Sequence, residues 1–459
     1  MDNPNKKNPF EIQNIRAFIT FRAFFNARFY YPVFTILFLD FGLSLEQFAI
    51  LNAVWAAVIV MAEVPSGALA DVIGRRNLVV FAGAAMVFEM ALIGFVPKKN
   101  ITLLFMLFLV NRVLSGLAEA AASGADEALA YDSLKQEGDI NEWGAVLEKE
   151  MRYRSIAMAV AMSLGAAVYD PAFMNRLFNL IGVDIILNQD ITLRLPLFLT
   201  LAMSVFAFMS ALKMKELSRE NNLACEDFTS CRNSVSAAFM LTLKAGKWVL
   251  SNPFALSVII SAMAFEHIIR MIVTLDSQIF RLIQLPEASF GLIGTGLSLL
   301  GVLIPRIARK LAENHSPQYN LGVCSILTLT GIYTMALFIP IYGLMPITLI
   351  YCVFYLIYFY VSYYLNQITD SDKRATVLSI KGLCFNCAYG LIGILYSLLV
   401  AFQRSGLMRS MPELHGETLE RDVFIKSFSW FPWYFIVILG ILLVYIWSSR
   451  GKIQSFNKQ

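Results

Sequence analysis

Residues 63–76 read EVPSGALADVIGRR, a short polar stretch between the apolar runs Phe48–Met61 and Leu78–Val96. Gly67 and Gly74 allow the backbone to turn tightly and to lie close to a neighbouring chain segment. Two adjacent arginines end the stretch, and basic residues beside an apolar span favour the cytoplasmic side of a membrane. The stretch therefore predicts a tight turn at a membrane surface between two helices that cross the bilayer.

The same pattern returns half a chain later. Residues 301–310 read GVLIPRIARK and align with residues 67–76, GALADVIGRR, at an offset of 301 − 67 = 234 positions in a chain of 459. The first glycine, the leucine, the isoleucine and the basic pair match, whereas Pro305 and Ala308 replace an aspartate and a glycine. Repetition at this spacing predicts two similar halves in the same orientation.

The first copy resembles the G-x-L-x-D-x-x-G-R-[RK] signature that joins the second and third helices of major facilitator superfamily transporters. The matching residues of this sequence are Gly67, Asp71, Gly74, Arg75 and Arg76. The resemblance implies an all-α membrane protein with twelve transmembrane helices in two six-helix halves. It also implies that the first, fourth, seventh and tenth helices line a central cavity.

The composition is that of a membrane protein. Hydrophobic residues make up 58% of the chain and charged residues 15%, whereas soluble domains carry about 25% charged residues. A helix of about 20 apolar residues spans a bilayer. Twelve such runs are predicted, over Asn14–Leu39, Leu45–Pro65, Asn77–Val96, Ile101–Ala122, Tyr153–Tyr169, Leu195–Leu212, Pro253–Leu275, Phe290–Ile307, Tyr319–Phe338, Pro346–Tyr364, Val377–Phe402 and Ser427–Trp447.

Lysine and arginine in the loops predict the orientation. With a cytoplasmic N-terminus, the inner loops hold 20 such residues and the outer loops 9. Both termini are therefore expected in the cytoplasm, and the protein in the cytoplasmic (inner) membrane. Residues 1–212 and 252–459 are expected to form the two halves, joined by a cytoplasmic linker over 213–251 that contains an amphipathic helix. The net charge of +4 reflects the loop bias and predicts no nucleic-acid partner.

Charged side chains at bilayer depth are costly and persist where they are paired, hydrated or functional. In the first span, Arg22 and Asn26 share one helix face and Tyr30 lies close by. In the fourth span, Arg112 and Glu119 lie on one polar stripe. The resemblance places both spans around the cavity, so these five residues are candidates for substrate binding.

The second half carries a corresponding set. Glu266 and Arg270 are i, i+4 neighbours in the seventh span, and the tenth span presents an aromatic stripe of Tyr351, Tyr355 and Tyr358. These five residues are the remaining substrate-binding candidates. Arginines around a cavity indicate a solute with an anionic group, and the aromatic residues indicate a partly apolar body.

Structural explanations remain open for the same residues. Arg112 could hold the halves together by pairing with a carboxylate, for which the candidates are Glu89, Glu119 and Glu266. Glu266 and Arg270 could neutralise each other, and the tyrosines could fill space between helices. The functional alternative for the three glutamates is proton coupling, because a carboxylate that is either protonated or paired with arginine links solute movement to a proton gradient.

The turn over residues 67–76 is also expected to act as a conformational latch at the inner surface. The end of the fourth span and the start of the eleventh look like segments common in a bacterial branch of the superfamily. Contacts between them and the turn would bridge the halves when the outside is open and break when the inside opens. The proposed latch residues are Gly67, Asp71, Gly74, Arg75, Arg76, Asp126 and Arg374.

Together these features predict a secondary active transporter that moves a small organic solute, anionic or amphiphilic, by alternating access and coupled to protons. It is expected to act as a monomer in the lipid bilayer. ATP-driven transport is not expected, because the chain has no G-x-x-x-x-G-K-[ST] loop. An intramembrane enzyme is not expected, because the chain has only three histidines, two of them in loops. No cofactor or metal is expected. The alternatives on the same fold are a drug or siderophore exporter, and a receptor or assembly factor that transports nothing.

Overall fold

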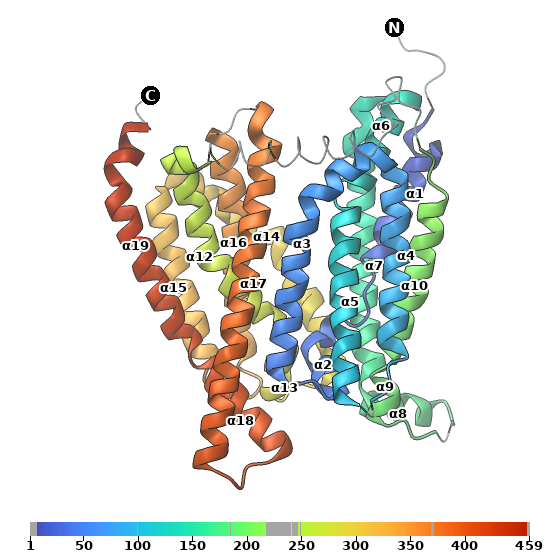
Figure 1. Cartoon of the computed structure of the whole chain (residues 1–459), viewed down its shortest axis with the longest axis vertical. Helices are drawn as coiled ribbons and strands as arrows, with labels where there is room; N and C mark the ends of the chain where they lie inside the picture. Colours follow the sequence, from blue (N-terminus) through green and yellow to red (C-terminus); the bar gives the residue numbers. More distant parts are fainter. Residues whose placement is uncertain are drawn as a thin grey trace.

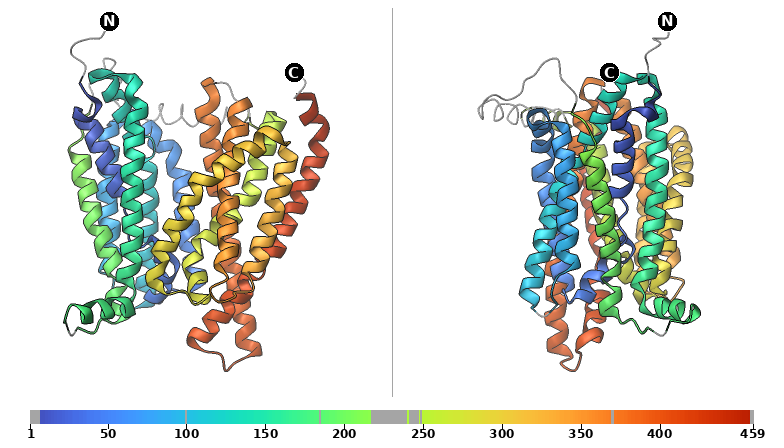
Figure 2. Two further views of the ribbon diagram at one scale, coloured as in Figure 1. Left: turned by 180° about the vertical axis from the view of Figure 1, so that it is seen from behind. Right: turned by 90° about the vertical axis from the view of Figure 1, so that its right-hand side faces the viewer.

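The computed structural model describes residues 7–98, 100–183, 185–216, 240, 247, 249–368 and 371–456. These residues form helices and no strand. Two helical bundles stand side by side, and both termini lie at one end of them (Figure 1). The bundles diverge toward that end and approach each other at the opposite end (Figure 2). Most of the predicted linker, including most of its predicted amphipathic helix, lies outside the described residues.

The first bundle contains the helices up to residue 212. They are η1 (Pro9–Glu11), α1 (Gln13–Phe25), η2 (Tyr31–Val33), α2 (Phe34–Phe41), α3 (Leu45–Ile73), α4 (Arg75–Gly94), α5 (Ile101–Ala122), α6 (Ala125–Glu137), η3 (Ile140–Glu142), α7 (Trp143–Tyr169), α8 (Pro171–Leu180), α9 (Gln189–Thr192) and α10 (Leu195–Leu212).

The second bundle begins at residue 253. It contains α12 (Pro253–Thr274), α13 (Asp276–Leu282), η4 (Glu287–Ser289), α14 (Phe290–Asn314), α15 (Pro317–Met335), α16 (Leu344–Ile368), α17 (Ser371–Ser410), α18 (Gly416–Phe428) and α19 (Phe431–Phe456).

Over the described residues, nine helices are long and apolar enough to cross a membrane. The helix pair α7–α8, bent by 87°, would make a tenth span. Each of the twelve predicted runs coincides with a helix or helix pair. The helices of the first run and α15 are not among those that are long and apolar enough to cross a membrane by this measure. The prediction of an all-α membrane fold is confirmed.

The polar turn lies where the sequence predicts it. Helix α3 ends at Ile73 and α4 begins at Arg75, with Gly74 between them at φ +92°. A side chain at this backbone angle would be strained, which explains the glycine. The second copy of the pattern differs, because α14 continues through it to Asn314. There Ala308 stands in place of the glycine, and an alanine does not favour the positive φ at which α3 ends.

The first predicted span is broken. Helix α1 ends at Phe25, and helical structure resumes only at η2 and α2. The proline at position 32 has no backbone N–H for the carbonyl of residue 28, and its ring crowds that carbonyl, so one continuous α-helix cannot run through this segment. The single continuous helix assumed for this span is therefore wrong, and Asn26 is the residue that caps α1.

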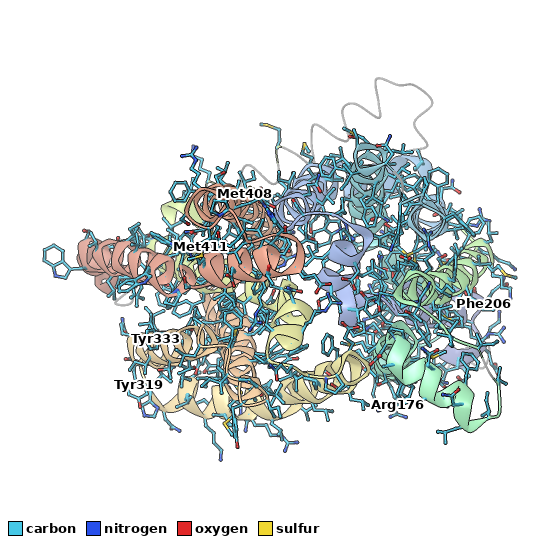
Figure 3. The ribbon with its side chains drawn as sticks, turned by 90° about the horizontal axis from the view of Figure 1, so that it is seen from below. Arg176, Phe206, Tyr319, Tyr333, Met408 and Met411 are labelled. Carbon is cyan, nitrogen blue, oxygen red and sulfur yellow. The ribbon has the colours of Figure 1, made fainter. Side chains whose placement is uncertain are left out.

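The surfaces of the bundles that face away from each other are rich in exposed aromatic and aliphatic side chains. Phe206, Tyr319 and Tyr333 are 48%, 50% and 65% exposed, and Figure 3 places all three on the periphery of the structure. An apolar outer surface of this kind is stable against lipid chains, because no water has to be ordered around it.

Candidate functional site

A cavity of about 510 Å³ lies between the two bundles. The first bundle lines it through η2, α2, α3, α5 and α7, and the second through α12, α13, α16 and α17. The structure brings six of the predicted substrate-binding residues together in its wall: Tyr30, Arg112, Glu119, Arg270, Tyr351 and Tyr358. The charged residues in the wall are two arginines, Arg112 and Arg270, and two acids, Glu119 and Asp276.

Arg112 is held by aromatic rings rather than by a carboxylate. Its guanidinium carbon lies 5.0 Å from the ring centre of Phe34 and 4.9 Å from that of Phe38, and only 4% of the residue is exposed. Its Nε and Nη2 atoms are buried without a hydrogen-bond acceptor. Among the described residues no carboxylate forms an ion pair with it. Buried donors without an acceptor are costly, so these two atoms mark Arg112 as a candidate contact for an anion.

Arg28, which the sequence did not predict as a site residue, partners the glutamates of the first bundle. Its Nη1 donates to Glu89 Oε1 at 3.0 Å, and its Nη2 lies 3.6 Å from Glu119 Oε2. The side chains of Arg28 and Glu89 are both buried. The break after α1 places Arg28 beside Glu89 and Glu119. The proline at position 32 is the sequence feature that could have indicated this break. Glu89 is therefore a buried ion-pair partner and does not line the cavity.

In the second bundle, Arg270 lies at the centre of a network. Its Nη1 is 3.5 Å from Glu266 Oε1 and donates to Asn386 Oδ1 at 2.9 Å. Its guanidinium carbon lies 4.4 Å from the ring centre of Tyr389. Tyr358 donates to the same glutamate oxygen at 3.2 Å. Glu266 thus lies behind the cavity wall, connected to it through Arg270 and Tyr358.

Asp276 is the second site residue that the sequence analysis missed. It is the first residue of α13 and accepts a hydrogen bond from the Tyr351 hydroxyl at 3.1 Å. In the part of the chain that the structure describes, no basic side chain forms an ion pair with it. The seventh span was predicted to end at Leu275, so this carboxylate was assigned to a loop. A wider margin at the ends of spans would have retained it.

The remaining predicted binding residues lie elsewhere. Arg22 pairs with Asp126, Nε to Oδ2, at 2.7 Å, and Asn26 donates to the backbone carbonyl of Arg22 at 2.8 Å. Tyr355 donates to the backbone carbonyl of Ser298 at 3.4 Å. None of these side chains is part of the cavity wall.

At the predicted latch, Arg75 Nη1 donates to Asp132 Oδ2 at 2.5 Å. Arg76 Nε donates to the backbone carbonyl of Met214 at 2.7 Å. Neither contact reaches the second bundle, since Asp132 lies in α6 and Met214 follows α10. Asp126 contacts neither arginine and pairs with Arg22. The side chains of Asp71 and Arg374, and the surroundings of Gly67, lie outside the described part of the chain.

Two ion pairs join the bundles at the end away from the termini. Arg281 of α13 donates to both carboxylate oxygens of Asp40 of α2, at 2.9 and 2.7 Å. Arg404 of α17 donates to both oxygens of Glu46 of α3, at 2.6 and 3.1 Å. The backbone N–H of Thr35 also donates to Ser277 Oγ across the interface, at 3.1 Å. The cavity is thus bounded on this side by polar contacts between the bundles.

The family model described as Major Facilitator Superfamily matches residues 16–394. No curated protein is similar enough to the chain to count as a match.

Solved structures resemble the whole chain. A bacterial homologue of the human lysosomal transporter Spinster, in an inward-facing and occupied conformation, has a TM-score of 0.68 at 15% identity, over 97% of this chain and 98% of that one. A point mutant of the nucleoside transporter NupG has a TM-score of 0.64 at 13% identity, over 95% and 100%. A structure of a proton-dependent oligopeptide transporter has a TM-score of 0.58 at 13% identity, over 95% and 98%. At these identities the likeness concerns the fold alone.

Proposed function

The chain belongs to the Major Facilitator Superfamily, and on that premise we propose that it is a secondary active transporter for a small organic solute with an anionic group. The observation that carries the proposal is Arg112. It lines a cavity between the two halves, is buried, and has two donor atoms without an acceptor. A carboxylate or phosphate group is the ligand that fits such a guanidinium, because its two oxygens accept two parallel hydrogen bonds.

The arrangement of the bundles supports transport by alternating access. Ion pairs close the cavity at the end away from the termini, whereas the bundles diverge at the end where both termini lie (Figure 2). With the termini in the cytoplasm, as the loop charges predict, this is an inward-open state in the cytoplasmic membrane. A rigid-body movement that separates Arg281 from Asp40 would open the cavity to the other side.

Proton coupling is the second part of the proposal, and Glu119 and Glu266 are its best-placed candidates. Glu119 lines the cavity, and Glu266 contacts the cavity residue Arg270. A solute anion that draws Arg270 away from Glu266 would leave a buried carboxylate unpaired, and taking up a proton is the cheapest way to neutralise it. Glu89 is less suited, because its partner Arg28 does not line the cavity.

The test compares Arg112→Lys with wild type in proteoliposomes, using counterflow of labelled mono- and dicarboxylates, phosphate esters and amino acids. A lysine keeps the charge but loses one of two charge-assisted hydrogen bonds, each worth about 1.5–3 kcal/mol. We expect transport of the recognised solute to fall about 10- to 100-fold. The matched control is Arg176→Lys. Arg176 is an exposed residue of α8 at the periphery in Figure 3, so this variant should transport as wild type does.

Three outcomes separate the alternatives. Normal counterflow by Arg112→Lys means that the arginine balances charge and does not contact the solute. Binding of a solute that never crosses the membrane indicates a receptor on the same fold. Efflux of bulky apolar compounds with no dependence on Arg112 indicates an exporter of the drug type.

A further inference from the structure

Two of the four charged residues that line the cavity have ion-pair partners, and two do not. Arg270 has Glu266 within 3.5 Å, and Glu119 has Arg28 within 3.6 Å. Arg112 and Asp276 form no ion pair with any described residue. One belongs to α5 in the first bundle and the other to α13 in the second, so a basic and an acidic side chain that form no ion pair with any described residue line the same cavity from different halves.

We propose that the solute is a zwitterion, with its anionic group at Arg112 and an ammonium group held between the Asp276 carboxylate and the Tyr351 hydroxyl. This inference rests on the proposed function and names its substrate class. Among the side chains that the structure describes, Tyr351 is the one that donates a hydrogen bond to Asp276. A carboxylate has room for about four such bonds, so its free acceptor sites suit the three donors of an ammonium group.

The charge balance of the cavity favours a zwitterion over a simple anion. During alternating access the cavity must pass through a state closed at both ends, in which water no longer screens its charges. A simple anion would neutralise Arg112 and leave the buried Asp276 carboxylate to be neutralised by a proton, because burying an isolated charge is strongly unfavourable. A zwitterion requires no such proton uptake. A solute with one charge of each sign neutralises both residues at once.

The position of the two charges also explains how such a solute could drive the conformational change. A ligand shifts a two-state equilibrium only if it binds one state better than the other. Asp276 directly precedes Ser277, whose hydroxyl accepts hydrogen bonds from the backbone N–H groups of Thr35 and Ile36 across the interface. An ammonium group at Asp276 therefore lies beside the contacts that must break for the cavity to open on that side.

The aromatic residues of the cavity wall suit the body of such a solute. Trp55 of α3 and Phe354 of α16 line the cavity from opposite bundles. The Trp55 ring already has the Arg270 guanidinium 5.7 Å from its centre, and the Phe354 ring packs against Tyr358. The apolar surface that these rings leave toward the cavity suits methylene groups. The wall therefore favours a solute whose amine is attached to a short apolar chain.

The experiment measures ligand-induced thermal stabilisation of the purified full-length protein in detergent. The probes are matched trios with a common carbon chain: β-alanine, γ-aminobutyrate, 5-aminovalerate and 6-aminohexanoate, each with its parent acid and its parent amine. The standard α-amino acids and simple dipeptides complete the panel, with their N-acetylated forms as acid-only partners. Wild type, Asp276→Asn, Arg112→Gln and the distant control Asp190→Asn are compared, and the unfolding midpoint without ligand verifies that each variant is folded.

We expect at least one zwitterion to bind wild type about tenfold or more tightly than its acid-only and amine-only partners. Asp276→Asn should reduce that preference over the acid-only partner to about twofold while leaving binding of the acid itself unchanged. Arg112→Gln should abolish both, and Asp190→Asn should behave as wild type.

The proposal is overturned if no zwitterion of the panel stabilises wild type, or if Asp276→Asn keeps the full preference. It is also overturned if the acid-only probes bind wild type as tightly as the zwitterions, because Asp276 then holds no amine. In this last case, acids that bind and are transported with dependence on Arg112 leave the proposed transport of an anion intact.

Discussion

The contact between Asp40 and Arg281 makes the most direct prediction about the mechanism. This pair joins α2 of the first bundle to α13 of the second. Tyr169 also donates a hydrogen bond to Asp40 at 2.5 Å, and Arg281 keeps a second partner in Glu287, at 2.8 Å from its Nε. Asp40→Asn therefore weakens the connection between the bundles and leaves Arg281 paired within its own bundle.

The size of the effect follows from the geometry. The substitution replaces two charge-assisted hydrogen bonds, and bonds to charged groups contribute about 1.5–3 kcal/mol each. The side chains of Asp40 and Arg281 are 19% and 32% exposed, and an asparagine can still accept one bond from the arginine. We therefore expect a net loss of about 2 kcal/mol, which is a factor of about 30 in the ratio of closed to open molecules at this end. An equilibrium of about 99:1 would become about 3:1.

The assay is pulsed electron paramagnetic resonance on spin-labelled cysteines in an otherwise cysteine-free protein. One label pair, at Leu180→Cys and Glu413→Cys, reports on the end away from the termini. The other, at Gln136→Cys and Glu313→Cys, reports on the end with the termini. Asp40→Asn should add a longer distance to the first pair and a shorter one to the second.

Asp190→Asn is the matched control for this experiment. It removes the ion pair with Lys98, which lies at the same end of the molecule but within the first bundle. Its distance distributions should equal those of wild type. Unchanged distributions in Asp40→Asn, or equal changes in both variants, would refute the idea that contacts between the bundles hold this end closed.

Two further predictions concern orientation and coupling. Cysteines introduced at Asn100 and Asn457 should react with a membrane-impermeant maleimide from opposite sides of the membrane, and labelling from one side would refute the cytoplasmic placement of both termini. Either Glu119→Gln or Glu266→Gln should still exchange solute between the two sides of a vesicle but fail to accumulate it against a gradient. If collapsing the proton gradient leaves accumulation by wild type unchanged, these acids serve only as partners of Arg28 and Arg270.

The fold could be predicted because the features that decide it are local. The glycine at position 74 ends α3 through its own backbone angle, φ +92°, and long apolar runs become helices because a bilayer leaves the backbone no other hydrogen-bond partner. The second copy of the turn shows the limit of this reasoning. It kept its basic pair but lost the glycine, and α14 runs through it to Asn314.

The site was less predictable because its geometry depends on departures from regular helices. The stripe of Arg22, Asn26 and Tyr30 assumed a continuous first helix. Since α1 ends at Phe25, the chain instead turns Arg28 toward Glu89, a residue 61 positions away. No periodicity in the sequence encodes that contact. Arg112 was identified because it lies in the middle of an unbroken helix, where spacing alone gives its direction.

The distribution of ion pairs among and between the bundles separates two roles for charge in this molecule. The pair Arg28–Glu89 lies within the first bundle and the pair Arg270–Glu266 within the second. A rigid-body movement of the bundles leaves both pairs intact, so they favour neither state. The pairs Asp40–Arg281 and Glu46–Arg404 cross the interface. They favour the state in which this end is closed by the interaction free energy that is lost when the bundles separate there.

In the proposed mechanism, a solute must offset that preference to reverse the state, and residues that are free to take a new partner allow it to do so. Arg112 and Asp276 are such residues from the start. Arg270 becomes one if the solute displaces Glu266, and the released glutamate then needs a counter-charge. Coupling to protons thus requires that the solute compete for an arginine inside one bundle, whereas movement of the bundles requires that it bridge both. A Glu266 variant that exchanges solute but does not accumulate it would assign proton coupling to this residue. An Arg112 variant that does neither would assign solute binding to Arg112, so the two tasks would belong to different residues.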